Sequence, residues 1–115
     1  MKELSSKITY KDRDYKLVFN LNVMEEIQDE YETLDNWGSM TDGKSGEVNI
    51  KALVFGITAM INEGIEIDNE ENGTNEPPMS HKRVARIISE IGFSKVTKDM
   101  NELVVESVKS DEKNE

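Results

Sequence analysis

The spacing of the apolar residues changes near residue 20, and this change limits the possible folds more than any other feature of the sequence. Across residues 7–20 apolar and polar residues alternate, so that Tyr15, Leu17 and Phe19 lie on one face of an extended segment. The polar residues 11–14 interrupt this stretch and predict a turn. We therefore expect a β-hairpin. A lone hairpin is marginally stable in water, so its apolar face must pack against the rest of the chain.

After residue 20 the apolar residues recur at the spacing that predicts amphipathic helices. A first helix would be capped by Asn22, run to about Trp37 and stop at the glycine that follows. A second helix, the most apolar, would be capped by Asn49 and would close at Gly64. Between these two helices, the glycine-rich residues 38–46 predict a flexible connection.

The second half of the chain begins with an acidic, asparagine-rich segment. This segment, residues 66–78, ends in two prolines and predicts a solvated loop. A third helix would be capped by Ser80 and run through Ile91, and a fourth would begin at Thr97. The polar residues 110–115 are expected to form a disordered tail.

Together these elements predict an α+β, mainly α fold, in which an N-terminal β-hairpin is followed by about four short helices. A chain of 115 residues has room for one modest core. We therefore expect residues 1–109 to form a single domain.

The chain carries 24 acidic and 14 basic residues, which gives a formal net charge of −10. A charge of this sign is repelled by nucleic acid phosphates and by anionic lipid headgroups, so neither nucleic acid nor membrane is an expected partner. No apolar run approaches the ~20 residues that span a bilayer, and the N-terminus lacks the apolar segment of a secretory signal. Cysteine is absent as well. These features predict a protein that stays in a reducing cytoplasm.

Candidate residues for catalysis, cofactor binding or metal binding are scarce. His81 is the single histidine and falls in the first turn of a predicted helix, beside Lys82 and Arg83, where a solvent-facing role is expected. Asp68 could open a calcium-binding loop, but Met79 then stands where the bidentate glutamate is needed. We expect a non-enzyme with no catalytic residue, cofactor or metal. A catalytic site built from carboxylates alone, and a weak cation site in the acidic loop, stay open as alternatives.

Five apolar residues are candidates for contact with a partner protein. A tryptophan at the end of a helix, as predicted here, is either a core residue or an interface anchor. Three consecutive apolar residues, 103–105, cannot all face the core, so one is expected to be exposed unless the hairpin covers it. The candidate contact residues are Trp37, Met40, Val104, Val105 and Val108.

Two segments of the sequence carry a resemblance to a known family. The junction between the predicted hairpin and the first helix reads Leu17-Val18-Phe19-Asn20-Leu21-Asn22, and the acidic start of that helix follows at residues 24–27. Later, residues 60–73 lead into the sequence Val84-Ala85-Arg86-Ile87-Ile88. In the order and composition of these segments, over residues 7–108, the chain resembles the tail assembly chaperones of long-tailed phages and prophages of Gram-positive bacteria.

This resemblance implies a factor in the host bacterial cytoplasm that is absent from the finished virion. Such a factor coats the tape measure protein and assists polymerisation of the tail tube around it, with the tail tube protein as a second candidate partner. The family supplies no catalytic or ligand residues. Self-association is also expected, because the apolar stripes are wide for so small a core. Two alternatives stay open: a structural tail component or connector, and a small acidic regulatory protein of the antitoxin type that binds a basic partner.

Overall fold

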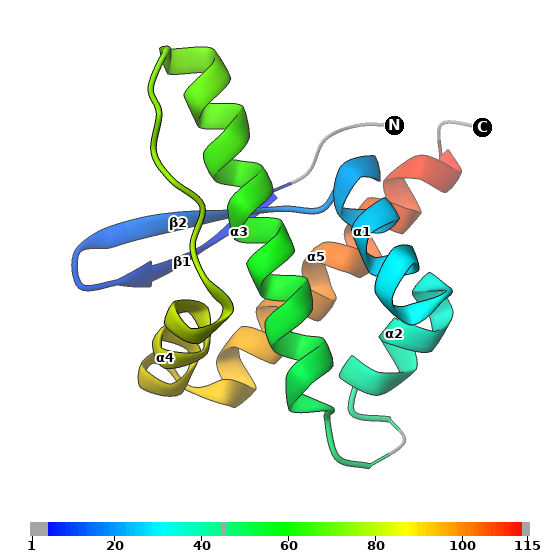
Figure 1. Ribbon diagram of the computed structural model, residues 1–115. Helices are drawn as coiled ribbons and strands as arrows, with labels where there is room; N and C mark the ends of the chain where they lie inside the picture. Colours follow the sequence, from blue (N-terminus) through cyan, green and yellow to red (C-terminus); the bar gives the residue numbers. More distant parts are fainter. Residues whose placement is uncertain (1–4, 45, 114–115) are drawn as a thin grey trace.

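The computed structural model describes residues 5–44 and 46–113, with side chains through residue 107. The predicted α+β, mainly α class is confirmed, with an N-terminal hairpin and, in the described part of the chain, five helices. The elements in chain order are β1 (Ser5–Tyr10), β2 (Arg13–Val18), α1 (Leu21–Tyr31), α2 (Leu34–Thr41), α3 (Ile50–Asn72), α4 (His81–Ile91) and α5 (Phe93–Lys113). In Figure 1, α3 runs across the front of the molecule, and α5 and the hairpin pass behind it.

The hairpin closes through a two-residue turn. Lys11 and Asp12 both have positive φ, 50° and 63°, which is the backbone geometry of a tight turn whose twist matches that of the flanking strands. The predicted alternation is confirmed up to Leu17, because Ile8 pairs with Tyr15 and both side chains are buried, together with Leu17. It ends at Val18, which is buried as well. This buried face of the hairpin is the apolar surface that the helices cover.

The first predicted helix is divided in two, and its predicted cap is wrong. Asn20 rather than Asn22 caps α1, with its side chain accepting a hydrogen bond from the Val23 N–H. The chain then turns at Glu32, where φ is 72°, and Thr33 caps α2 through a hydrogen bond from the Asn36 N–H. Thr33 therefore caps a second helix inside the stretch whose apolar spacing predicted one continuous helix. As a result, α2 extends to Thr41, into the segment predicted as a flexible connection.

Gly64 does not end the second predicted helix, because α3 continues to Asn72 and is closed by Gly73 in the left-handed conformation. A β-carbon at position 64 would lie 2.8 Å from the Lys16 carbonyl oxygen, so the glycine lets β2 approach the helix closely. Half of the predicted acidic loop is therefore helical. The rest of that segment is held against α3 by two hydrogen bonds of 3.0 Å between the Asn69 side-chain amide and the Glu76 backbone. Just beyond the segment, the Asn62 amide pairs with the Met79 backbone through hydrogen bonds of 2.8 and 3.1 Å.

The last two helices follow the prediction in part. Ser80 caps α4, which ends at Ile91 as expected, and Gly92 makes the turn with a φ of 117°. However, α5 begins at Phe93 rather than Thr97. Its backbone is helical through Lys113, so it enters the segment 110–115 that the sequence predicted as a disordered tail, and residues 114–115 lie outside the described residues.

One connected core gathers buried side chains from both strands and from every helix described above. α3 is the central element, since it contacts β2, α1, α2 and α4, while α5 packs against α4 and β1. The buried face of α3 explains the dense apolar pattern of this helix. Its fully buried residues include Leu53, Ile57, Met60 and Ile61. This arrangement leaves a space between α2 and α5. The two helices pack on the same core but meet each other at one end only.

Candidate functional site

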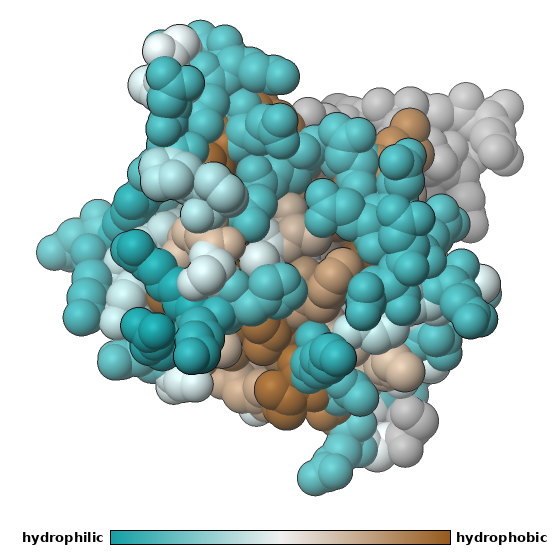
Figure 2. All heavy atoms as spheres, in the orientation of Figure 1, coloured by the Kyte–Doolittle hydropathy of each residue, from teal (hydrophilic) through white to brown (hydrophobic). Residues whose placement is uncertain are grey.

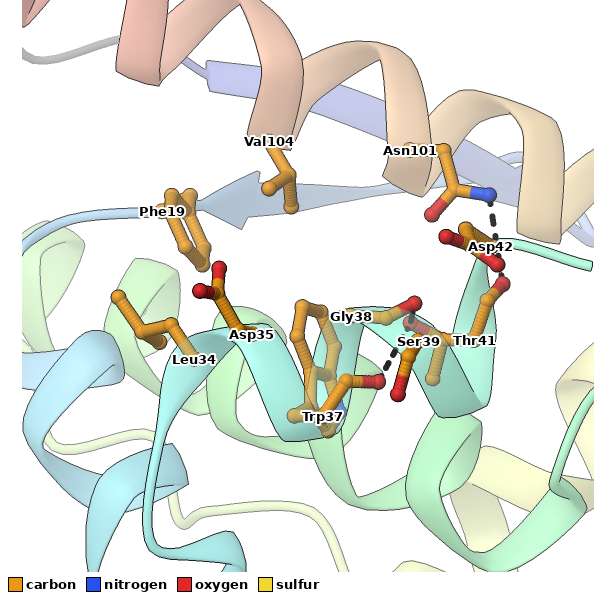
Figure 3. A pocket seen from close by; sticks show the side chains of 10 residues that line it. All are labelled: Phe19, Leu34, Asp35, Trp37, Gly38, Ser39, Thr41, Asp42, Asn101 and Val104. Carbon is orange, nitrogen blue, oxygen red and sulfur yellow. Dashed lines mark hydrogen bonds between the residues drawn. The ribbon is translucent and has the colours of Figure 1, made fainter. Parts of the chain in front are cut away.

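The space between α2 and α5 is a groove with a volume of about 330 Å³. Its walls come from α2 on one side and α5 on the other, and Phe19 reaches it from the junction between β2 and α1 (Figure 3). This volume is at the small end of the range of binding pockets. The lining residues are Phe19, Leu34, Asp35, Trp37, Gly38, Ser39, Thr41, Asp42, Asn101 and Val104. We call this surface the α2–α5 groove.

The floor of the groove is formed by Trp37. Its side chain is only 2% exposed, and its indole N–H donates a hydrogen bond of 2.9 Å to the carbonyl oxygen of Ala52 in α3. Its ring stacks on Phe19 with 6.5 Å between the ring centroids. Of the two roles considered for this residue, the geometry is that of a core residue whose edge lines the groove. It does not project outward as an anchor.

The walls are tied together at one end by Asn101. Its side-chain amide donates a hydrogen bond of 3.3 Å to the backbone carbonyl of Thr41, which links α5 to the last turn of α2. The Thr41 hydroxyl in turn donates to the Trp37 carbonyl at 3.1 Å. Further along, the half-buried Leu34 and Val104 provide apolar walls. The groove is thus apolar at its floor and middle and polar at its rim.

Two carboxylates, Asp35 and Asp42, line the groove at opposite ends of α2. Both residues are exposed. Asp42 accepts a hydrogen bond of 2.8 Å from the Lys44 backbone N–H. Neither carboxylate forms an ion pair within the described residues. The five ion pairs found there involve other acidic residues. Figure 3 shows both side chains on the α2 side of the space that faces α5.

The structure brings together two of the five predicted contact residues. Trp37 and Val104 line the same groove, whereas Met40 is half-buried against the core. Val105 is 50% exposed and lies outside the groove, while its neighbour Leu103 is buried, so the three consecutive apolar residues do divide between core and surface. The side chain of Val108 lies outside the described residues.

Sequence reasoning did not find the groove residues Phe19, Leu34, Asp35, Asp42 and Asn101. These residues were missed because the sequence predicted a single long helix up to Trp37. That prediction left no separate α2 and placed Asp42 in a flexible connection. Thr33, a strong capping residue inside the periodic stretch, was the signal that could have revealed that α2 starts there.

A second apolar surface lies on the N-terminal half of α3. Ile50 is 58% exposed, and Val54 and Phe55 beside it are half-buried. The Phe55 ring meets Tyr31 of α1 edge to face, with 5.5 Å between centroids. Figure 2 shows hydrophobic side chains gathered over this part of α3. We call Tyr31, Ile50, Val54 and Phe55 the α3 patch.

The polar residues considered for chemistry lie apart. His81 is exposed, and its ring centroid is 6.0 Å from that of Phe55. Asp68, proposed as the start of a calcium-binding loop, lies inside α3, so its neighbours follow a helix and not a loop. Within residues 5–44 and 46–113 no group of three or more His, Asp or Glu side chains is arranged to hold a metal ion.

Acidic side chains of α1 and α3 do meet beside the first cap. The Glu63 carboxylate accepts hydrogen bonds from the side-chain amides of Asn20, at 2.6 Å, and Asn22, at 2.9 Å. Burial raises the pKa of the neighbouring Glu26 carboxyl, and the negative charges of Glu63 and Glu66 raise it further. These contacts position α1 on α3.

The fold and the groove define a small, mainly helical α+β protein that presents apolar helix surfaces with an acidic rim. A scan of protein-family models finds no match to this chain, and searches of curated proteins and of solved structures find none either. Among the described helices, none combines the length and the apolar character needed to cross a bilayer.

Proposed function

We propose that this chain is a non-catalytic tail assembly chaperone that binds the tape measure protein in the cytoplasm of the bacterial host and assists polymerisation of the tail tube. The observation that carries the proposal is the α2–α5 groove, because Trp37 and Val104, two residues selected as partner contacts from the sequence, lie in its floor and wall. The resemblance of residues 7–108 to such chaperones supports the same function.

The mechanism is physical. An apolar ridge of a helical client would lie in the groove, in the way that amphipathic helices are held by other helix-lined grooves. Burying it there removes the ridge from water and from other copies of the client until the tail tube replaces the chaperone. The net charge of −10 would keep many chaperone copies on one client apart and soluble.

The α3 patch gives the chaperone a second apolar surface that shares no residue with the groove. Because Ile50 leaves more than half of its side chain in solvent, this patch supports self-association or a contact with the tail tube protein. A chaperone that coats a long client needs such a second contact so that neighbouring copies can pack.

Co-expression with the tape measure protein from the same gene cluster tests this function. The wild-type chain should raise the soluble fraction of the client, and the two proteins should purify together. Val104→Glu, which places a charge in the groove wall, should abolish this effect. Phe93→Glu, at the exposed first position of the same helix and outside the groove, is the control and should retain it. An unchanged soluble fraction of the client with the wild-type chain would remove the chaperone function.

A structural tail component is separated from a chaperone by the composition of the virion. A chaperone should be absent from purified particles by mass spectrometry, whereas a connector should be present in fixed stoichiometry. An antitoxin-like protein would instead protect cells from one basic partner and would leave tail assembly unchanged.

A further inference from the structure

The rim of the α2–α5 groove carries charge of one sign. Its described lining residues include Asp35 and Asp42 and no lysine or arginine. Neither carboxylate has an ion-pair partner among the described residues, although lysines elsewhere on the chain, such as Lys95 with Asp99, do pair. The floor between the two carboxylates is apolar. A ligand that fills this groove is therefore offered apolar contacts at its centre and unpaired negative charge at its ends.

The position of Asp42 strengthens this preference for a cation. Asp42 is the C-cap of α2, where the last backbone carbonyls of the helix carry a partial negative charge. The helix terminus and the carboxylate therefore attract a positive group at the same point. Asn101 satisfies the Thr41 carbonyl there but brings no charge. At the other end of α2, Asp35 lies in the first helical turn, and its carboxylate also lines the groove.

We propose that the α2–α5 groove binds an amphipathic helix of a partner polypeptide whose apolar ridge is flanked by lysine or arginine residues. This inference rests on the proposed function and deepens it by defining the client segment. Apolar contact with the half-buried Leu34 and Val104 would supply most of the affinity. The flanking charges would supply orientation and a faster, salt-dependent association.

Trp37 provides the measurement, because it is the single tryptophan in the chain and lines the groove. The probes are two synthetic tryptophan-free helical peptides of about 18 residues, with the same leucine ridge and either lysine or glutamate flanks. The lysine peptide should shift the Trp37 emission in a saturable manner, with a Kd that rises with added salt. The glutamate peptide should not bind.

The variant Asp35→Asn/Asp42→Asn tests the carboxylates. Removing both charges should weaken binding of the lysine peptide about fivefold, the sum of two partly exposed ion pairs. The matched control is Glu70→Gln/Glu71→Gln, which removes the same charge from exposed positions at the far end of α3 and should leave the Kd unchanged. Far-UV circular dichroism checks folding. The single variant Asp42→Asn, which does not alter the first turn of α2, serves if the double variant unfolds.

Equal binding of the two peptides, an unresponsive Trp37, or an unchanged Kd in the aspartate variant would each overturn the groove proposal. The chaperone function is tested by a separate measurement, the solubility of the tape measure protein. If the tape measure protein is kept soluble while the lysine peptide does not bind, the function stands and the groove proposal falls. If the peptide binds at the groove but the chain has no effect on the tape measure protein, the groove proposal stands and the chaperone function falls.

Discussion

The indole ring of Trp37 packs directly on the backbone of Gly56, and a β-carbon added at position 56 would lie 2.4 Å from the Trp37 Cζ2 atom. This contact fixes α2 against α3 and so sets the height of the groove floor. The indole N–H bond to the Ala52 carbonyl, one turn earlier in α3, holds the ring in the same orientation. Together the two contacts connect the core of the protein to its candidate binding surface.

Gly56→Ala should destabilise the fold, because the buried indole ring has no space to move aside. Overpacking of this kind costs about 1–3 kcal/mol in the free energy of unfolding, which urea titration followed by circular dichroism measures. Gly38→Ala is the control, since nothing lies within 4 Å of a β-carbon there. That change should stabilise α2 by about 0.5–1 kcal/mol through helix propensity. A Gly56→Ala protein as stable as the wild type would contradict the contact.

Thr58→Val should leave stability unchanged or raise it by about 1 kcal/mol. Among the described residues, the Thr58 hydroxyl is a buried side-chain oxygen without a hydrogen-bond partner, so its removal relieves a desolvation cost. The paired comparison is Thr41→Val. Thr41 is equally buried but donates a hydrogen bond to the Trp37 carbonyl, and losing it should cost about 1 kcal/mol. Thermal melting of both variants gives the comparison, and a reversed order would refute it.

Glu26→Gln should raise stability near neutral pH. Burial, with the charges of Glu63 and Glu66, raises the pKa of Glu26 in the folded protein, so the folded state holds this proton more tightly than the unfolded chain does. The stability that this protonation provides is present at low pH and is lost as pH rises through the folded pKa.

The difference in urea midpoint between Glu26→Gln and the wild type should therefore shrink as the pH falls through the raised pKa of the folded protein, and the protonation effect should be complete below the ordinary glutamate pKa of 4.5. Glu25→Gln, which removes the same charge from the preceding position of α1, is the control and should show a smaller difference. A stability gain that persists unchanged in acid would show that the carboxyl proton is not the cause.

Ile50→Glu should reduce self-association without a loss of stability. The Ile50 side chain is 58% exposed at the first position of α3, where a negative charge also favours the helix dipole. Sedimentation velocity measures the change in oligomer population. Lys51→Glu places the same side chain at the next, exposed position and should have a weaker effect. If both variants associate like the wild type, the α3 patch is not the contact between copies.

The elements that the sequence predicted well are those whose signals are local. The alternation around Tyr15 and Leu17 predicted the hairpin, because side chains two residues apart must share a face of a strand. Ser80 and Gly92 predicted the start and end of α4, since a cap and a turn depend on neighbouring backbone groups alone. The division of residues 103–105 between core and surface followed from helical geometry in the same way.

Gly64 and Gly38 were wrongly predicted to end helices, because their roles depend on contacts with distant parts of the chain. Gly64 had the local features of a helix end, but the backbone of Lys16 packs against it and stabilises α3 beyond that point. Gly38 lies inside α2 for a related reason, because Trp37 is held by Gly56 and Ala52 of another helix. Packing energy from a long-range contact can exceed the modest helix propensity cost of one glycine.

Sequence alone determined the class of the fold, the apolar content of each helix and the acidic character of the surface, because these follow from the period and the chemistry of neighbouring residues. Tertiary structure alone decided that Trp37 forms the floor of the groove and does not project as an interface anchor. It also decided that Asp35, Asp42 and Val104 line the same groove. The physical reason is that a groove exists only between elements. Its shape depends on how far α2 and α5 are held apart by Trp37 and the core beneath them.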